Sequence, residues 1–406
     1  MNNEFEYKAI NKDGDIVKGF KKSNDEISLS NELKSEDLKL IYAEPVNKIG
    51  FRNLTERLKN FGTVSTRDKI LIYRNISSMI TAGLPLSRAI SVLIRQSKNP
   101  KTKSVLEKVH EDVKKGQSFS DSLAKFPKTF TPLMVSMVKA GEESGNLAES
   151  LKVTSDQMEK AYNLQKKIRG AMIYPGVIIT AMIIIGFLMM VLVVPTLTGT
   201  FAELNVELPA TTQFVINFSD FLQSNIVLSI SSMLFLVVSF IAGIRTKKGN
   251  RIFSWLMLRT PVVSGLVKKI NSARTARTLS SLLASGVSFV HSIEIVVDVV
   301  QNPYYKEVLE EARKKVEIGQ PISKVFEKNE NLYPIFVSEM MVVAEETGEL
   351  GPMLFKVAEF YEEEVDQQTK NMSTIVEPVL MIIVGAAVGF FAISMISPMY
   401  SLVETI

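Results

Sequence analysis

The stretch AMIYPGVIITAMIIIGFLMMVLVV (171–194) decides the fold class, because it carries no charged residue over 24 positions. At 1.5 Å per residue, a helix of this length crosses a hydrocarbon core of roughly 30 Å. Two more uncharged runs follow, IVLSISSMLFLVVSFIAGI (226–244) and PVLMIIVGAAVGFFAISMI (378–396). A buried helix of a soluble protein usually shows a polar edge within such a length. The sequence therefore predicts a membrane protein with transmembrane helices at 171–194, 226–244 and 376–396.

The distribution of Lys and Arg predicts how these helices are oriented. The loop 195–225 and the tail 397–406 contain neither residue, whereas RTKKGNR (245–251), directly after the second span, contains four. Cytoplasmic loops are enriched in Lys and Arg. We therefore expect the N-terminus and residues 245–375 in the cytoplasm, and the loop 195–225 and the C-terminus outside.

An internal repeat relates the two halves of the chain. Adding 203 to a position between 74 and 175 reaches its counterpart almost without gaps. The matched pairs include Arg74 with Arg277, Gly83 with Gly286, Asn99-Pro100 with Asn302-Pro303, Glu143 with Glu346, and Pro175 with Pro378. The sequence thus predicts two parallel copies of one unit, a cytoplasmic helical domain that continues into a membrane helix.

Each copy reads as an all-α bundle of about six helices. Segments 67–82, 86–98 and 101–115 repeat apolar residues with helical spacing. Residues 1–50 differ: they alternate like strands around Asp13-Gly14, a hairpin signal, with a short helix expected at about 25–35, which predicts a small α+β module. The expected order is module 1–50, linker or amphipathic helix 51–65, first bundle 66–170, span 171–194, external loop 195–225, span 226–244, basic linker 245–260, second bundle 261–375, span 376–396 and external tail 397–406. The helix at 51–65 either lies on the membrane or docks on the first bundle.

The composition excludes several classes of chemistry. The 406 residues contain no Cys and two His, His110 and His291, which we expect at the surface. No phosphate-binding loop, GxGxxG, HExxH, EF-hand or nucleophile-elbow pattern is present. We therefore expect no enzyme active site, no catalytic residue and no cofactor.

Two acidic corners are the main candidate sites. KAGEESGNL (139–147) contains Glu142, Glu143 and Gly145, and VAEETGEL (343–350) contains Glu345, Glu346 and Gly348. Adjacent residues point to different faces of a helix, so the Glu pairs suit acid–base catalysis poorly. The favoured interpretation is a structural corner with each glycine in the left-handed conformation. Partner contact, or a loosely held hard cation at Glu142, Glu143 or Glu346, is the alternative.

Arginines, prolines and charge balance supply the remaining candidates. Arg74 and Arg277 lie on otherwise apolar helices, where they either hold an internal carboxylate or face a partner. Pro175 and Pro378 stand where each cytoplasmic helix enters the membrane and predict a kink. Residues 51–170 contain 22 Lys and Arg against 11 Asp and Glu, whereas residues 261–373 contain 12 against 17. This asymmetry suggests different partner surfaces, with Glu362, Glu363, Glu364 and Asp366 as an acidic contact, or simply attraction of the basic copy to anionic lipid.

An ordered set of motifs resembles the inner-membrane platform proteins of type IV pilus and type II secretion machines (general secretion pathway protein F and PilC-like). The set comprises AGLPLSRAI (82–90), GQSFSDSL (116–123), GEESGNL (141–147), YP (174–175), VVPTL (193–197) and ELPATTQ (207–213), with second-copy versions SGVSFVHSI (285–293), GQPISKVF (319–326), EETGEL (345–350) and EP (377–378). The second copy departs at Ala344 and Glu377, where the first has Gly141 and Tyr174.

The resemblance implies a non-enzymatic platform in the bacterial inner membrane. It implies contact with a cytoplasmic hexameric ATPase, transfer of pilin or pseudopilin subunits into a fibre, other inner-membrane assembly proteins as neighbours, and a homo-oligomer, dimer or higher, in the lipid bilayer. Direct binding of nucleic acid is not expected. A membrane-anchored enzyme would need a set of catalytic residues, and the sequence shows none. The alternative is a multi-pass transporter with parallel repeats, which would need polar or broken spans.

Overall fold

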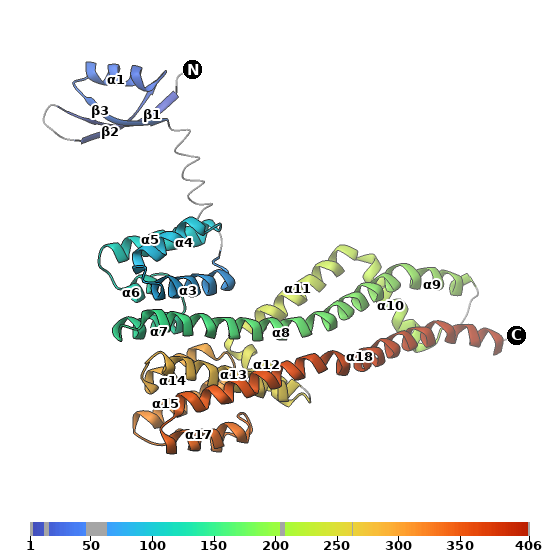
Figure 1. Ribbon diagram of the computed structural model, residues 1–406. Coiled ribbons are helices and arrows are strands. Elements are labelled where there is room, and N and C mark those ends of the chain that lie inside the picture. The colour runs from blue at the N-terminus through green and yellow to red at the C-terminus, as the bar shows by residue number, and fades with distance from the viewer. Residues whose placement is uncertain (1–2, 12–15, 46–62, 204–207, 262, 405–406) are drawn as a thin grey trace. The chain divides into compact units, whose positions relative to one another are not determined.

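The computed structural model describes residues 3–11, 16–45, 63–203, 208–261 and 263–404, and these are mostly helical (Figure 1). The chain divides into two compact units, Met1–Thr131 and Pro132–Ile406. The domain borders drawn from the sequence remain predictions.

The N-terminal module is a small α+β fold, as expected. Strands β1 (Asn3–Ile10), β2 (Ile16–Ser23) and β3 (Lys39–Pro45) form an antiparallel sheet in the order β2-β1-β3, with helix α1 (Glu26–Ser35) before β3. Phe5, Leu29, Leu33 and Ala43 form its core. The turn at Asp13-Gly14 and the linker or amphipathic helix up to residue 62 lie outside the described residues.

Six helices follow one another in each repeat. The first has α3 (Thr66–Thr81), α4 (Leu86–Gln96), α5 (Pro100–Lys114), α6 (Phe119–Ala124), α7 (Pro132–Glu143) and α8 (Leu147–Leu188). The second has α13 (Val263–Ala284), α14 (Phe289–Val299), α15 (Pro303–Glu317), α16 (Ser323–Lys328), α17 (Ile335–Thr347) and α18 (Leu350–Glu404). The starts of α4, α5, α7 and α8 recur 203 positions later, which confirms the repeated helical fold.

The same local signals start and end the helices of both copies. Asn99 accepts a hydrogen bond from the backbone N–H of Lys101 at 2.9 Å, and Asn302 accepts one from that of Tyr304 at 3.0 Å. In both cases a proline occupies the first helical position. A backbone N–H at that position has no partner within the helix, so its absence in proline costs no hydrogen bond. Gly83 ends α3 with a φ of +86°, a conformation that costs glycine little.

Helices α3 to α6 form a core of their own within the first unit. Tyr73 on α3 is buried and meets Phe130 edge-on, with ring centroids 6.2 Å apart. Ile76, Leu106 and Leu123 are buried as well. This apolar core is what the helical spacing of the sequence predicts.

Helix α13 is the centre of the second unit. It contacts α8, α12, α14 and α18, and most of its residues from Leu266 to Leu282 are buried. Many of these residues are small, such as Ser272, Ala273 and Ala276, which lets neighbouring helices approach closely. The last two helices of the first repeat belong to this unit: α7 packs on α14, and α8 packs on α13 and α18 (Figure 1).

Among the residues that the structure describes, three helices are long and apolar enough to cross a membrane, within Leu147–Thr200, Ile226–Arg245 and Val376–Ile396. The first continues from α8 through a π-helical turn, η1 (Met189–Val193), into α9 (Val194–Glu203). The second is α11 (Ile226–Arg245) and the third lies within α18. At most 17% of any of these apolar windows is buried, so their side chains are available to lipid.

The segment 195–225, expected as a loop, is largely helical. Helix α10 (Ala210–Ser224) buries Val215 and Ile216 in a cluster with Val194 and Met395 from the ends of the first and third spans. The expected tail is helical too, because α18 continues to Glu404. The absence of Lys and Arg in this segment does not reveal the apolar face that holds α10 in place.

Candidate functional site

The second acidic corner joins α17 to α18. Helix α17 ends at Thr347, Gly348 takes a φ of +74°, and α18 begins at Leu350. The half-buried Glu345 accepts hydrogen bonds from the backbone N–H groups of Ile322 at 2.5 Å and Ser323 at 3.3 Å. A carboxylate here satisfies N–H groups that the start of α16 leaves unpaired. Glu345 therefore anchors α16 to the corner, while Glu346 is exposed.

The first acidic corner has the same backbone path between α7 and α8. Gly145 has a φ of +73°, two residues before α8 begins at Leu147. Glu142 is half-buried, and Glu143 is exposed with its carboxylate 3.9 Å from the Lys139 ammonium. The structure thus separates the neighbouring glutamates of each corner into one partly enclosed and one exposed side chain.

A close contact explains why the first copy has Gly141 where the second has Ala344. Gly141 packs directly against Ser150 of α8, and a Cβ atom added there would collide with the Ser150 side chain. The Ser150 hydroxyl donates to the backbone oxygen of Met137, which holds α7 and α8 together. In the second copy the corresponding positions are Ala344 and Met353. The two corners therefore share a backbone path but not their packing.

Arg277 forms a buried ion pair between α13 and α18. Its Nε and Nη2 atoms donate to the two carboxylate oxygens of Glu362 at 2.7 and 2.8 Å. The side chains of Arg277 and Glu362 are 7% and 17% exposed. The guanidinium also lies 4.5 Å from the ring centroid of Phe355, a favourable cation–π distance. The equivalent Arg74 is half-buried on α3.

The acidic run before the third span is largely occupied within the second unit. Besides Glu362, Glu364 accepts from Lys269 at 2.7 Å, and Asp366 lies 2.6 Å from Lys167 of α8. Hydrogen bonds from Lys167 and then Lys370 lower the pKa of Asp366 below its usual value. Of the four residues suggested as an acidic partner contact, three are engaged in intramolecular ion pairs, which leaves Glu363 exposed.

A buried polar contact between α8 and α13 was not predicted. The Gln157 amide group bonds to the Thr278 hydroxyl at 3.3 Å and accepts from the Ser281 hydroxyl at 3.2 Å. Ser280-Ser281 repeats Ser77-Ser78 at the 203-residue offset, so this side of the contact is visible in the sequence. Its partner lies 124 positions away, however, and no local pattern connects the two.

The prolines and histidines occupy different environments. Helices α8 and α18 continue through Pro175 and Pro378, and the predicted kinks remain predictions. His291 is exposed, with Nδ1 3.0 Å from Glu294. His110 is partly buried, and burial, together with the nearby Lys114 ammonium, lowers its pKa.

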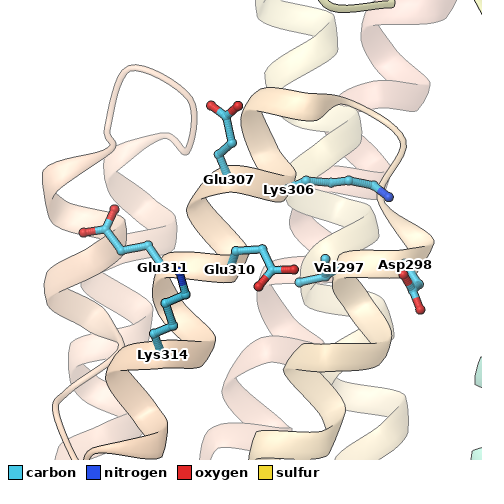
Figure 2. Close-up of a pocket in the computed structure, with 7 residues that line it drawn as sticks. All are labelled: Val297, Asp298, Lys306, Glu307, Glu310, Glu311 and Lys314. Carbon is cyan, nitrogen blue, oxygen red and sulfur yellow. The ribbon is translucent and has the colours of Figure 1, made fainter. Parts of the chain in front are cut away.

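The ion-binding alternative has no cluster to support it in the part of the chain that the structure describes, where no three His, Asp or Glu side chains come together as metal ligands. A groove of about 530 Å³ lies instead between α14 and α15, with mostly charged residues along it (Figure 2). It is lined by Val297, Asp298, Lys306, Glu307, Glu310, Glu311 and Lys314. Four carboxylates against two ammonium groups give this groove a negative balance.

Comparison with known proteins identifies the family. The family model described as type II secretion system (T2SS), protein F, matches residues 72–195 and 275–398, one match in each repeat. Type IV pilus assembly protein PilC of Thermus thermophilus is 34% identical over 84% of this chain and 84% of its own length. The PilC protein of Myxococcus xanthus is 31% identical over 99% and 96%. Type II secretion system protein F of Vibrio cholerae is 29% identical over 97% of each chain. With two matched repeats and full-length relatives, the chain belongs to the type II secretion system protein F family, which includes the PilC proteins of type IV pili.

Proposed function

We propose that this platform protein couples a cytoplasmic hexameric ATPase to the assembly of pilin or pseudopilin subunits at the inner membrane. Family membership makes it a non-enzymatic platform of a type IV pilus or type II secretion machine. Coupling to the ATPase is the further step. The observation that carries it is the continuity of α8 and α18, each of which runs without a break from a helical repeat into a candidate membrane span.

These long helices are suited to transmit displacement. At 1.5 Å per residue, the 42 residues of α8 and the 55 residues of α18 extend about 63 and 82 Å. They are joined to each other through Lys167 and Asp366, and to α13 through Gln157 and Arg277. A push on the helices outside the membrane would therefore reach both spans together.

The charge balance supports separate partner surfaces for the two repeats. Residues 63–131, which hold α3 to α6, contain 13 Lys and Arg against 5 Asp and Glu. Residues 286–349, which hold α14 to α17, contain 6 against 12. The first repeat is therefore basic and the second acidic. Because like charges repel across an interface, a partner surface of one sign favours one repeat over the other. We assign the exposed Glu143 and Glu346 to contacts with the ATPase, other assembly proteins or a second copy of the chain.

The Lys and Arg distribution supports the expected orientation. Basic residues precede the first span and follow the second, as in RTKKGNR (245–251). We therefore propose that both helical repeats face the cytoplasm, where an ATPase would find its nucleotide, and that the C-terminus lies outside.

The test interrupts helical continuity after Gly170 of α8, an exposed position where an added Cβ meets no neighbour. Seven inserted glycines break the rigid connection, whereas seven alanines add about two helical turns and preserve it. We expect the glycine variant to keep its membrane level and its co-purification with the ATPase but to lose fibre assembly, while the alanine variant retains assembly. Equal assembly by both variants would refute mechanical coupling through α8. A failure of the unmodified chain to co-purify with the ATPase would refute the partner.

A further inference from the structure

Helix α12 (Lys247–Arg259) is joined to the second span by a one-residue corner. Thr246, the only residue between α11 and α12, accepts a hydrogen bond through its hydroxyl from the backbone N–H of Gly249 at 3.1 Å. Gly249 lies directly against the carbonyl group of Gly243, with no room for a Cβ atom. The corner therefore fixes α12 immediately beside the end of a membrane helix.

The exposed face of α12 is apolar where a helix in water would be polar. Ile252, Trp255 and Leu256 are 68%, 44% and 54% exposed. Lys248 and Arg259 lie on the same face, four residues before Ile252 and four after Trp255. Apolar and aromatic side chains flanked by basic ones on an exposed helix face are typical of helices that lie in a membrane interface.

The opposite face is held by the second repeat. Ser254 is buried, and Asn250 donates to the backbone oxygen of Gln301 at 3.4 Å. At the border between the two faces, Arg251 bonds to Glu307 at 2.7 Å, and its guanidinium lies 5.3 Å from the centroid of the Tyr304 ring. The α13 and α15 contacts therefore direct the apolar face of α12 outward.

A groove of about 470 Å³ runs along this face, lined by Lys248, Arg251, Ile252, Trp255 and Tyr304. The surface that lines it is almost wholly apolar, so Lys248 and Arg251 contribute mainly their aliphatic stems. Arg251 has Glu307 as its acidic neighbour. The apolar wall consists of Ile252 and the two aromatic rings. An acyl chain suits this apolar surface, and an anionic headgroup would meet the charged ends of the two basic side chains.

We propose that α12 is an interfacial helix whose groove binds an anionic phospholipid. Lys248 and Arg251 receive the phosphate, while Ile252 and Trp255 pack against the acyl chain. Continuity with α11 favours lipid over a protein partner, because the corner at Thr246 holds the groove at the level where the span leaves the bilayer. Basic residues beside a membrane surface attract anionic lipid, and tryptophan favours the interface.

Trp255 is the one tryptophan of the 406 residues, so its fluorescence reports this groove alone. The full-length chain is placed in two kinds of nanodisc made of zwitterionic phosphatidylcholine. One contains phosphatidylglycerol with brominated acyl chains, and the other contains phosphatidylcholine with brominated acyl chains at the same mole fraction. We expect stronger quenching by the brominated anionic lipid. Lys248→Gln, at an exposed side chain, should weaken that preference by about fivefold, and Lys248→Gln/Arg251→Gln by more. The control Lys101→Gln/Lys103→Gln on α5 makes the same charge change and should leave the preference unchanged.

Three results would overturn the proposal. If neither brominated lipid quenches the fluorescence, Trp255 lies outside the bilayer, and the apolar face of α12 is then a contact surface for a protein partner. Equal quenching by both lipids shows an interfacial helix without an anionic site. Binding of inorganic phosphate, combined with no preference between the two brominated lipids, assigns Lys248 and Arg251 to a free anion. Lys248→Gln keeps the Arg251–Glu307 contact, so its effect is readable even where the double variant misfolds.

Discussion

Replacing Arg277 by alanine is expected to loosen the second unit more than any loss of an exposed ion pair. The change removes both hydrogen bonds to Glu362 and the contact with Phe355. It leaves a carboxylate that is 17% exposed without its cation, between α13 and α18. A mostly buried charge without a partner is far costlier than the loss of a surface contact.

The structure contains a matched comparison on the same two helices. Lys269 and Glu364 also lie 2.7 Å apart between α13 and α18, but their side chains are 29% and 33% exposed. Removing one partner of a buried pair costs about 3–5 kcal/mol, whereas solvent-exposed pairs contribute about 0.2–1 kcal/mol. The two pairs join the same helices at the same distance, and they differ in burial and in the second hydrogen bond and the Phe355 contact of Arg277.

Hydrogen–deuterium exchange of the full-length protein measures the difference locally. Because each 1.4 kcal/mol is a factor of about ten, Arg277→Ala should accelerate exchange in α18 around Glu362 by about two orders of magnitude. Lys269→Ala should accelerate it less than about fivefold. In Arg277→Met/Glu362→Met, which removes both charges and keeps apolar volume, much of the protection should return.

Similar exchange in Arg277→Ala and Lys269→Ala would refute the argument from burial. Unchanged exchange combined with lost ATPase co-purification would show instead that Arg277 faces a partner, which is the alternative that the sequence leaves open.

Three further predictions concern the corners and a histidine. Gly141→Ala should destabilise the α7–α8 contact by about 1–3 kcal/mol, because the new methyl group meets Ser150; thermal unfolding in detergent measures this, and an unchanged transition would contradict it. Glu345→Ala should cost about 1 kcal/mol by uncapping α16, while Glu346→Ala, at an exposed neighbour, should cost nothing measurable in the same assay. Because the pKa of His110 is lower in the folded protein, the unfolded chain binds this proton more tightly. The contribution of neutral His110 to stability is present above the unfolded pKa near 6.5 and is lost as pH falls toward the folded pKa. His110→Gln should therefore lose less melting temperature than the parent chain between pH 7 and pH 5, and parallel losses would exclude this role.

Much of the fold could be predicted because the deciding signals are local. An uncharged run reports a span by itself, and Asn99-Pro100 and Gly83 mark helix ends within a few residues. The 203-residue offset then carried each such signal to the second copy. These features need no knowledge of what packs against what.

The candidate site was less predictable because its contacts are distant in sequence. Gln157 and Ser281 stand 124 positions apart, and Arg277 and Glu362 stand 85 apart. The sequence pointed to Arg277 as unusual but could not name its carboxylate. It also showed Glu362 within an acidic run, where exposure to a partner was as reasonable as burial against α13. Contacts between residues distant in the sequence decide whether such a side chain is buried or exposed. The periodicity of one helix does not reveal those contacts.

The packing of the second unit shows that the two repeats are not interchangeable. Helices α7 and α8 come from the first repeat, yet they pack on α14, α13 and α18 of the second. Gln157 on α8 bonds to α13, a helix that belongs to the other copy. Because α8 thereby becomes a neighbour of α13, a sequence change in one repeat alters the environment of the other. The divergence at Gly141 and Ala344 has a more local cause, since Gly141 packs against Ser150 where the second copy has Met353. Duplication has produced two long helices that lie side by side and share one set of contacts, while the charges of their two repeats differ in sign. Under the proposed coupling, a force applied to α8 or α18 would be passed to both spans through these shared contacts.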